Sequence, residues 1–159
     1  MRNWQQKRLF QTLIYFAACG VIVSCSDDGT GSVGAVEARA VVDHSDWKVA
    51  AEGATESTVA RGERIIQMCA GCHGIGEGAP SPAGPSLHGI MGRRVGSLDS
   101  YPYTQALTNQ TESWTVKQFD EFITSPQDLY PGTGMAFSGL KSREDRAALI
   151  AYLATKSLP

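Results

Sequence analysis

Apolar residues recur at helical spacing in three segments between residue 57 and the C-terminus. With one further short segment, we predict helices over residues 57–68, 104–109, 115–124 and 142–156. The apolar positions that define the buried faces are Val59, Ile65, Ile66, Val116, Phe119, Ile123, Leu149, Tyr152 and Leu153. No segment shows a convincing strand pattern, and no internal repeat is present. The pattern therefore predicts an all-α fold.

Residues at the ends of these segments support their assignment as helices. Ser57 or Thr58 can cap the first helix, and Ser142 can cap the last. Glu144 and Asp145 favour the first turn of the last helix because their charge complements the helix dipole. The predicted helices therefore begin where capping groups are available.

Gly62 lies inside the first predicted helix, where glycine costs about 1 kcal/mol relative to alanine. Glycine lets another backbone approach closely because it has no Cβ atom. We therefore expect a packing contact at Gly62 that compensates for the lost helix propensity.

Glycine and proline mark the predicted loops. Residues 74–96 contain too many of both for regular structure, and residues 130–135 form a second, tighter loop. Many of the 17 glycines fall in or near these two regions. Such loops are expected where a chain wraps closely around a rigid group.

The N-terminus has the pattern of an export signal. Arg2, Lys7 and Arg8 precede an apolar stretch over residues 9–23, which is short for a membrane span of about 20 residues. The stretch ends in Ile-Val-Ser followed by Cys25, which resembles a bacterial lipobox. We predict a signal or lipoprotein signal over residues 1–24. An uncleaved anchor and an ordinary cleaved signal remain alternatives, and all three export the domain.

Residues 25–56 are predicted to be a flexible linker, followed by one folded domain over residues 57–159. About 30 residues of flexible coil have a root-mean-square reach of roughly 30 Å. His44 is expected to be an exposed linker residue rather than a metal ligand.

The charge balance argues against nucleic-acid binding. The formal net charge is -2, and without residues 1–24 the chain has 11 basic and 16 acidic residues. A nucleic-acid-binding domain normally has a basic patch. The sequence therefore does not predict a nucleic-acid partner.

Cys69, Cys72 and His73 form a C-x-x-C-H sequence, which indicates covalent haem attachment. Residues three apart on a helical turn lie on one face, so the two thiols match two vinyl groups on one edge of a porphyrin. The next residue, His73, delivers its ring to the iron from the same turn. The tether and one axial ligand thus come from five consecutive residues.

A zinc site and a thioredoxin-like site are the alternatives for this motif. A structural zinc site needs four ligands, but the only other histidines are His44 and His88 and the other cysteines lie near the N-terminus. A thioredoxin-like site needs a βαβ context that the pattern does not predict. Haem attachment is therefore the favoured interpretation.

The second axial ligand must come from elsewhere in the chain. The candidates are Met68, Met91, Met135, His88 and His44. Met68 adjoins Cys69 and is too close to the His73 side to reach across the haem. Met135 follows the Pro-Gly-Thr-Gly loop, which can hold a thioether rigidly, and we favour it. Paired His and Met ligands raise the reduction potential of the iron and leave no open position for a substrate.

From residue 60 to the C-terminus the chain resembles class I cytochrome c. The motifs that carry the resemblance, in order, are Gly62 to His73, Gly84-Pro85-Ser86-Leu87-His88-Gly89, Gly92-Arg93, Tyr103-Thr104, Trp114, Pro126, Pro131-Gly132-Thr133-Gly134-Met135-Ala136-Phe137 and Leu149-Ile150-Ala151-Tyr152-Leu153. The resemblance implies the cytochrome c fold, with four or five short helices around one covalent haem c. It also implies that the first and last helices of the domain cross, with Gly62 and Ile66 packed near Leu149 and Tyr152.

The resemblance further implies individual roles. The Pro85 carbonyl is expected to accept a hydrogen bond from the His73 ring. Thr133 is expected near the inner propionate, and His73 and Met135 are expected to bind the iron. The residues that match positions bonding the haem propionates are Arg93, Tyr103, Thr104 and Trp114.

The implied function is single-electron transfer by one haem, not enzyme catalysis. The expected donor is a quinol–cytochrome c reductase or a dehydrogenase, and the expected acceptor is a terminal oxidase or reductase of a respiratory or photosynthetic chain. The protein is expected to face the periplasm, tethered by a lipid at Cys25 or by an N-terminal anchor, or to be soluble there if the signal is cleaved. The alternatives are an electron-entry subunit of a larger complex and a haem-based sensor or peroxidase.

The chain departs from the family at the exposed haem edge. The usual ring of lysines there is mostly absent, and matching positions carry Met68, Gln127, Asp128 and Gly134. A tyrosine common inside the haem pocket is here Phe122. Strongly charge-steered docking is therefore not expected, although tethering can compensate by raising the effective concentration.

Overall fold

A computed structural model describes residues 43–157 of the chain. The helices are α1 (Ser45–Glu52), α2 (Glu56–Ile65), α3 (Gln67–Ala70), α4 (Gln105–Thr108), α5 (Val116–Thr124), α6 (Pro126–Leu129) and α7 (Arg143–Ser157). Within residues 43–157 the only β-type pairing is an isolated bridge between Arg94 and Ser113. The predicted all-α class is confirmed, with seven helical segments in this part rather than four or five. The predicted signal segment and Cys25 lie outside the described residues.

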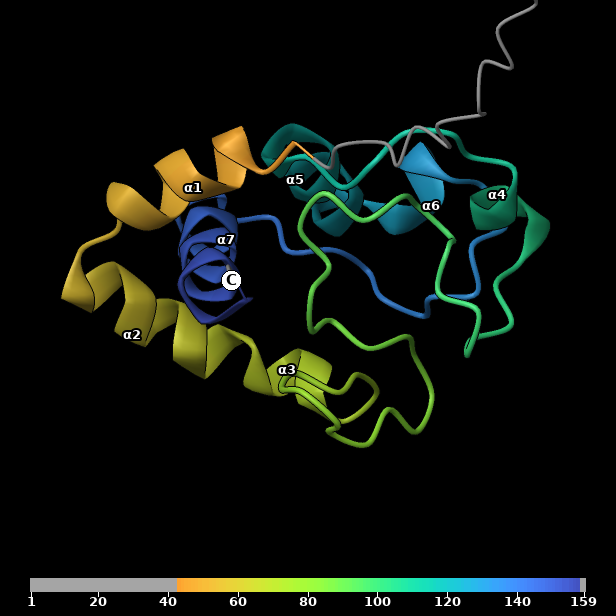
Figure 1. The fold of residues 1–159 in the computed structure, drawn as a ribbon, viewed down its shortest axis with the longest axis horizontal. Helices are drawn as coiled ribbons and strands as arrows, with labels where there is room; N and C mark the ends of the chain where they lie inside the picture. Colours follow the sequence, from red (N-terminus) through yellow and green to blue (C-terminus); the bar gives the residue numbers. More distant parts are fainter. Residues whose placement is uncertain (1–42, 158–159) are drawn as a thin grey trace, which may run out of the picture. The chain divides into compact units, whose positions relative to one another are not determined.

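Helix α7 is the centre of the helical packing. It contacts α2 most extensively, and it also contacts α1 and α5. Figure 1 shows α7 nearly along its axis, with α1 on one side and α2 on the other. The predicted crossing of the first and last helices of the domain is the α2–α7 contact. None of the helices within residues 43–157 is long and apolar enough to cross a membrane.

Gly62 is where α2 and α7 approach most closely. A Cβ atom at this position would lie 2.6 Å from Tyr152 Cβ and 2.8 Å from the backbone carbon of Ala148. Only glycine fits at such a distance, so the expected packing contact is confirmed. Burial of both helix faces offsets the poor helix propensity of glycine.

Helix α1 corrects the linker prediction in its described part, residues 43–56. Ser45–Glu52 are helical, and the Trp47 side chain is fully buried. His44 is half-buried instead of exposed, and its Nδ1 atom is buried without a hydrogen-bond partner among the described residues. An eight-residue helix is unstable alone in water, so α1 depends on its packing against α7 and α5.

The observed caps refine the predicted helix ends. Helix α2 is capped by Thr55, whose Oγ1 accepts from Thr58 N at 3.2 Å. The predicted cap at Ser57 or Thr58 is therefore wrong, because both residues lie inside the helix. Helix α5 is capped in the same way by Thr115. The predicted cap of the last helix is confirmed because Asp145 N donates to Ser142 Oγ at 3.1 Å.

The core beside α5 is aromatic. The ring of Trp114 contacts Phe119, Phe122 and Tyr130 at centroid distances of 5.0–6.3 Å. Trp47 of α1 extends this cluster through Phe119, at 5.6 Å. Of these rings, Trp114, Phe119 and Phe122 line a cavity, and Trp47 and Tyr130 pack behind them.

Candidate cofactor site

A cavity of about 270 Å³ lies between α3, α5, α7 and the long loops. Its lining includes all ten residues that the sequence predicts for the site: Cys69, Cys72, His73, Pro85, Arg93, Tyr103, Thr104, Trp114, Thr133 and Met135. These residues span 67 positions of the chain. The fold therefore gathers the predicted set at one place.

Cys69, Cys72 and His73 share one turn that begins in α3. The backbone nitrogens of Cys72 and His73 donate to the Cys69 carbonyl at 3.0 and 2.9 Å. Cys69 is half-buried and Cys72 is exposed. Burial raises the pKa of the free Cys69 thiol to about 11. Redox-active C-x-x-C pairs have a lowered pKa instead, so this environment does not suit disulfide exchange.

His73 is oriented by a backbone carbonyl. Its Nδ1 atom lies 2.6 Å from the Pro85 carbonyl oxygen, which is the contact expected from the resemblance. With Nδ1 as donor, the Nε2 lone pair is free to bind a metal. Within residues 43–157 no group of three or more His, Cys, Asp or Glu side chains could hold a metal ion. A zinc site built from these side chains is therefore not supported.

Gly84 is a contributor that the predicted site did not include. A Cβ atom there would lie 2.6 Å from Nδ1 and 2.8 Å from Nε2 of His73. The Gly84 nitrogen also donates to the Cys72 carbonyl at 2.8 Å. The imidazole ring thus lies flat against backbone. Gly84 begins the Gly84–Gly89 motif that the chain shares with class I cytochrome c, but its close approach to His73 is visible only in the structure.

The Met135 loop is held from both sides. Gln127 Nε2 donates to the Thr133 carbonyl at 2.9 Å, and Thr133 N donates to the Tyr130 carbonyl at 2.9 Å. Gly132 has φ +87°, a value that favours glycine. The side chain of Thr133 is almost completely buried. Met135 is therefore presented by a constrained loop.

The other candidates for the second axial ligand are less well placed. His44, His88 and Met91 do not line the cavity, and Met91 is buried in the core. Met68 does line it but is 58% exposed and adjoins Cys69 in α3. Among the candidates, only Met135 combines a place in the lining with a position distant in sequence from His73.

Arg93 provides a test of which cofactor fits. Its guanidinium donates to the Ser86 and His88 carbonyls at 2.7 and 3.1 Å, but Nε is buried with no partner. Burial lowers the pKa of this guanidinium, and no carboxylate of residues 43–157 forms an ion pair with it. Burial of an unpaired cation is costly. A carboxylate of a bound group, such as a haem propionate, fits this position.

The remaining walls of the cavity are mostly apolar. They include Ile66, Leu87, Ile90, Leu107, Phe119, Phe122, Ile123, Phe137, Leu140, Leu149 and Leu153. Tyr103 is one of the few polar residues of the lining, and burial raises its pKa.

The periodic pattern identified several of the apolar lining residues as core, but it could not indicate that the core faces a cavity. An apolar pocket with a few polar groups suits a large planar cofactor.

Comparison with known proteins points to the same cofactor. A family model described as cytochrome c matches residues 59–157. The chain is similar to the cytochrome c of Nigella damascena, with 41% identity over 95 residues that cover 59% of this chain and 86% of the relative. It is also similar to the cytochrome c2 of Rhodoblastus acidophilus, with 41% identity over 92 residues that cover 58% and 86%. For the cytochrome c2 of Blastochloris viridis the identity is 38% over 100 residues, covering 63% and 79%.

Proposed function

This chain belongs to the cytochrome c family, and from that premise we propose which of its residues hold the haem and where the protein works. Proteins of this family carry one covalently bound haem c and transfer single electrons. The chain is accordingly a monohaem electron carrier and not an enzyme. When bound, the haem iron supplies a reversible one-electron couple.

We assign the covalent attachment to Cys69 and Cys72, and the iron ligands to His73 and Met135. The assignment is supported by one observation above all: the C-x-x-C-H turn and the Met135 loop line the same cavity. Pro85 holds the His73 ring so that Nε2 can bind the iron. Met135 would supply the second protein ligand to the iron.

We assign the propionate contacts to Arg93, Tyr103, Thr104 and Trp114, with Thr133 close to the inner propionate. The orphaned Nε atom of Arg93 supports this assignment, since it needs an acceptor inside the cavity. The apolar walls would keep water from the iron. Exclusion of water favours the ferrous state, which carries less charge on the iron.

Electrons are proposed to enter and leave through the edge formed by Cys69 and Cys72. Cys72 is exposed, and Met68 beside it is 58% exposed. These are small or apolar groups rather than lysines, so docking there would depend on apolar contact more than on long-range attraction. The proposed donor is a quinol–cytochrome c reductase or a dehydrogenase, and the proposed acceptor is a terminal oxidase or reductase.

Haem attachment can be tested by extraction. We expect the porphyrin to stay with the polypeptide after denaturation and acid–acetone treatment, because thioether bonds survive it. In a double Cys69→Ala, Cys72→Ala variant the porphyrin should be released. A control variant, Met91→Leu, should retain it, because Met91 does not line the cavity. Release of porphyrin from the unaltered protein would overturn the assignment.

The proposed location is outside the cytoplasm, in a protein tethered through a lipid at Cys25 or through an N-terminal anchor. The charged and apolar pattern of residues 1–24 supports export. The intact mass of membrane-extracted protein separates the alternatives. Lipidation predicts a chain that begins at Cys25 and carries acyl chains, and replacement of Cys25 by Ser should remove that mass. A full-length mass would indicate an uncleaved anchor.

A further inference from the structure

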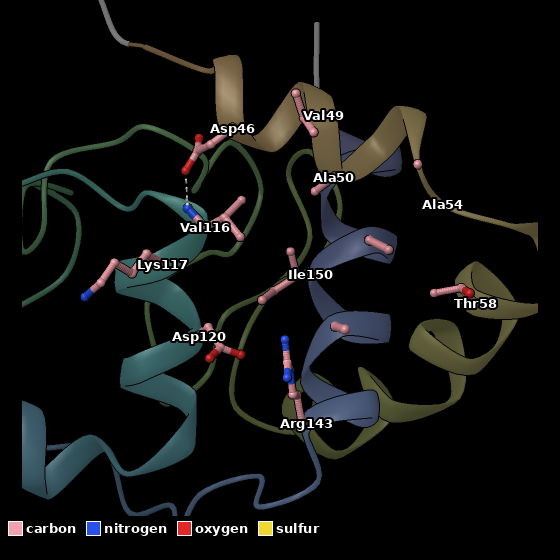
Figure 2. Close-up of a pocket in the computed structure, with 13 residues that line it drawn as sticks. Asp46, Val49, Ala50, Ala54, Thr58, Val116, Lys117, Asp120, Arg143 and Ile150 are labelled. Atoms are coloured by element: carbon pink, nitrogen blue, oxygen red, sulfur yellow. Dashed lines mark hydrogen bonds between the residues drawn. The ribbon is translucent and has the colours of Figure 1, made fainter.

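Helix α1 makes two contacts with the segment that carries Trp114. The buried Trp47 side chain donates from Nε1 to the Trp114 carbonyl at 2.6 Å. Two residues further along, Val116 N donates to the Asp46 carboxylate, as Figure 2 shows. The carboxylate also suits the N-terminus of α5, where the helix dipole is positive. Asp46 and Trp47 therefore hold the backbone on both sides of Thr115.

The Trp114 carbonyl is also the point where two cavity-lining segments meet. It accepts a second hydrogen bond, from Gly92 N at 2.9 Å, and Trp114 N donates to the Arg93 carbonyl at 2.9 Å. The backbones of Arg93 and Trp114 are thus directly bonded. Any contact that fixes the Trp114 carbonyl also limits the movement of Arg93.

The Trp47 ring supports the same region by packing. Its centroid lies 5.6 Å from the Phe119 ring, and Phe119 lies 6.0 Å from the Trp114 ring. The side chains of Trp114 and Arg93 both line the cavity, whereas Trp47 does not. Trp47 can therefore act on the cavity only through these neighbours.

We propose that Trp47, assisted by Asp46, is a positioning residue that holds Arg93 and Trp114 in place as donors to the haem propionates. Helix α1 precedes residues 59–157, to which the family model corresponds, so this support is an addition to the matched domain. The inference rests on the proposed propionate contacts. Donors held close to a propionate offset its negative charge, and that charge otherwise favours the ferric iron. Loss of positioning should therefore lower the reduction potential.

The test compares Trp47→Phe with Ala147→Gly in the full-length holoprotein. Phenylalanine keeps an aromatic ring but removes the N–H donor. The side chain of Ala147 is exposed in the groove between α1 and α7, and glycine there weakens α7 without removing any hydrogen bond of Trp114. The two readouts are the reduction potential by spectroelectrochemistry and the hydrogen exchange of the Trp114 indole N–H by NMR of the ferrous protein.

For Trp47→Phe we expect a lower reduction potential. We also expect the Trp114 indole N–H to exchange about tenfold faster, because the loss of one hydrogen bond changes an equilibrium by about this factor. Ala147→Gly should keep both wild-type values. Wild-type values in Trp47→Phe would overturn the proposal, as would equal changes in both variants, which would indicate general loosening.

A second variant keeps the proposal testable if Trp47→Phe does not accumulate as holoprotein. Asp46→Ala removes the acceptor for Val116 N and leaves the Trp47 indole in place. The same two changes, smaller in size, would support the proposal, and wild-type values would overturn it. Wild-type values in either variant, in a protein that carries covalent haem and shows the absorption band of a Met–iron bond, would overturn the positioning role and leave the proposed function intact. Absence of covalent haem from the wild type would contradict the proposed function instead.

Discussion

Replacing Gly62 by alanine tests the close approach of α2 to α7. In an ordinary exposed helix this change stabilises by about 1 kcal/mol, because alanine has the higher helix propensity. Here the added Cβ atom would lie 2.6 Å from Tyr152 Cβ and even closer to the Ala148 carbonyl oxygen. The carbonyl belongs to helix backbone, so the strain cannot be relieved by a change of rotamer. We therefore expect Gly62→Ala to destabilise the protein.

The size of the effect follows from two opposing contributions. Overpacking against rigid neighbours costs up to about 3 kcal/mol. The gain in helix propensity returns about 1 kcal/mol, so the free energy of unfolding should fall by about 2 kcal/mol. For a domain of this size each kcal/mol corresponds to a change of roughly 4–8 °C in Tm, and Tm should therefore fall by about 8–16 °C.

The measurement is guanidinium and thermal unfolding of the holoprotein, followed by far-ultraviolet circular dichroism. Gly76→Ala is a matched control, because a Cβ atom at Gly76 meets nothing within 4 Å. The control should match the wild type or gain slightly, through reduced entropy of the unfolded chain. If Gly62→Ala were as stable as Gly76→Ala, the reasoning from close helix contact would be refuted.

Three further predictions concern the cavity and its surroundings. Met135→Ala should abolish the long-wavelength absorption band of the oxidised protein that is typical of Met–iron bonding; a persisting band would mean that another methionine binds the iron. Arg93→Gln should lower the reduction potential by about 20–60 mV, which corresponds to a change of up to tenfold in the equilibrium constant for one-electron reduction. An unchanged potential would contradict the propionate contact. Burial and the hydrogen bond to Glu112 raise the pKa of Tyr130 from 10.0 to about 12, so the folded state keeps this proton while the unfolded state loses it. The stabilisation from Tyr130 should thus be complete below pH 10 and decline by on the order of 1 kcal/mol between pH 10 and 12. Unfolding titrations of wild type and Tyr130→Phe should therefore converge over that interval, and parallel curves would refute the pKa assignment.

Short-range patterns predicted most of the helices. The cap at Ser142 and the helical spacing of Val116, Phe119 and Ile123 depend on contacts within one or two turns. Helix α1 was missed for the corresponding reason. Its eight residues contain one buried side chain, Trp47, and no repeated apolar face. Its stability comes from partners that are distant in sequence, so no local pattern could reveal it.

The features of the site also fall into those that local sequence predicts and those that only the folded structure reveals. The proposed attachment motif could be recognised because Cys69, Cys72 and His73 lie within one turn of backbone. Met135 could be favoured from its loop, but the sequence alone could not place it in one cavity with His73, 62 residues earlier. The close approach of Gly84 to the His73 ring and the unpaired Nε of Arg93 are visible only once the loops are folded.

The sequence by itself determined the motif proposed for haem attachment, the helical class and the positions of the main loops. These depend on spacing between near neighbours, which the covalent chain specifies directly. Only the tertiary structure decided that α1 is part of the domain and that Trp47 bonds to a carbonyl 67 residues away. Such contacts require complementary packing between segments that are distant in sequence. Their energy is distributed over many residues that share no local sequence pattern.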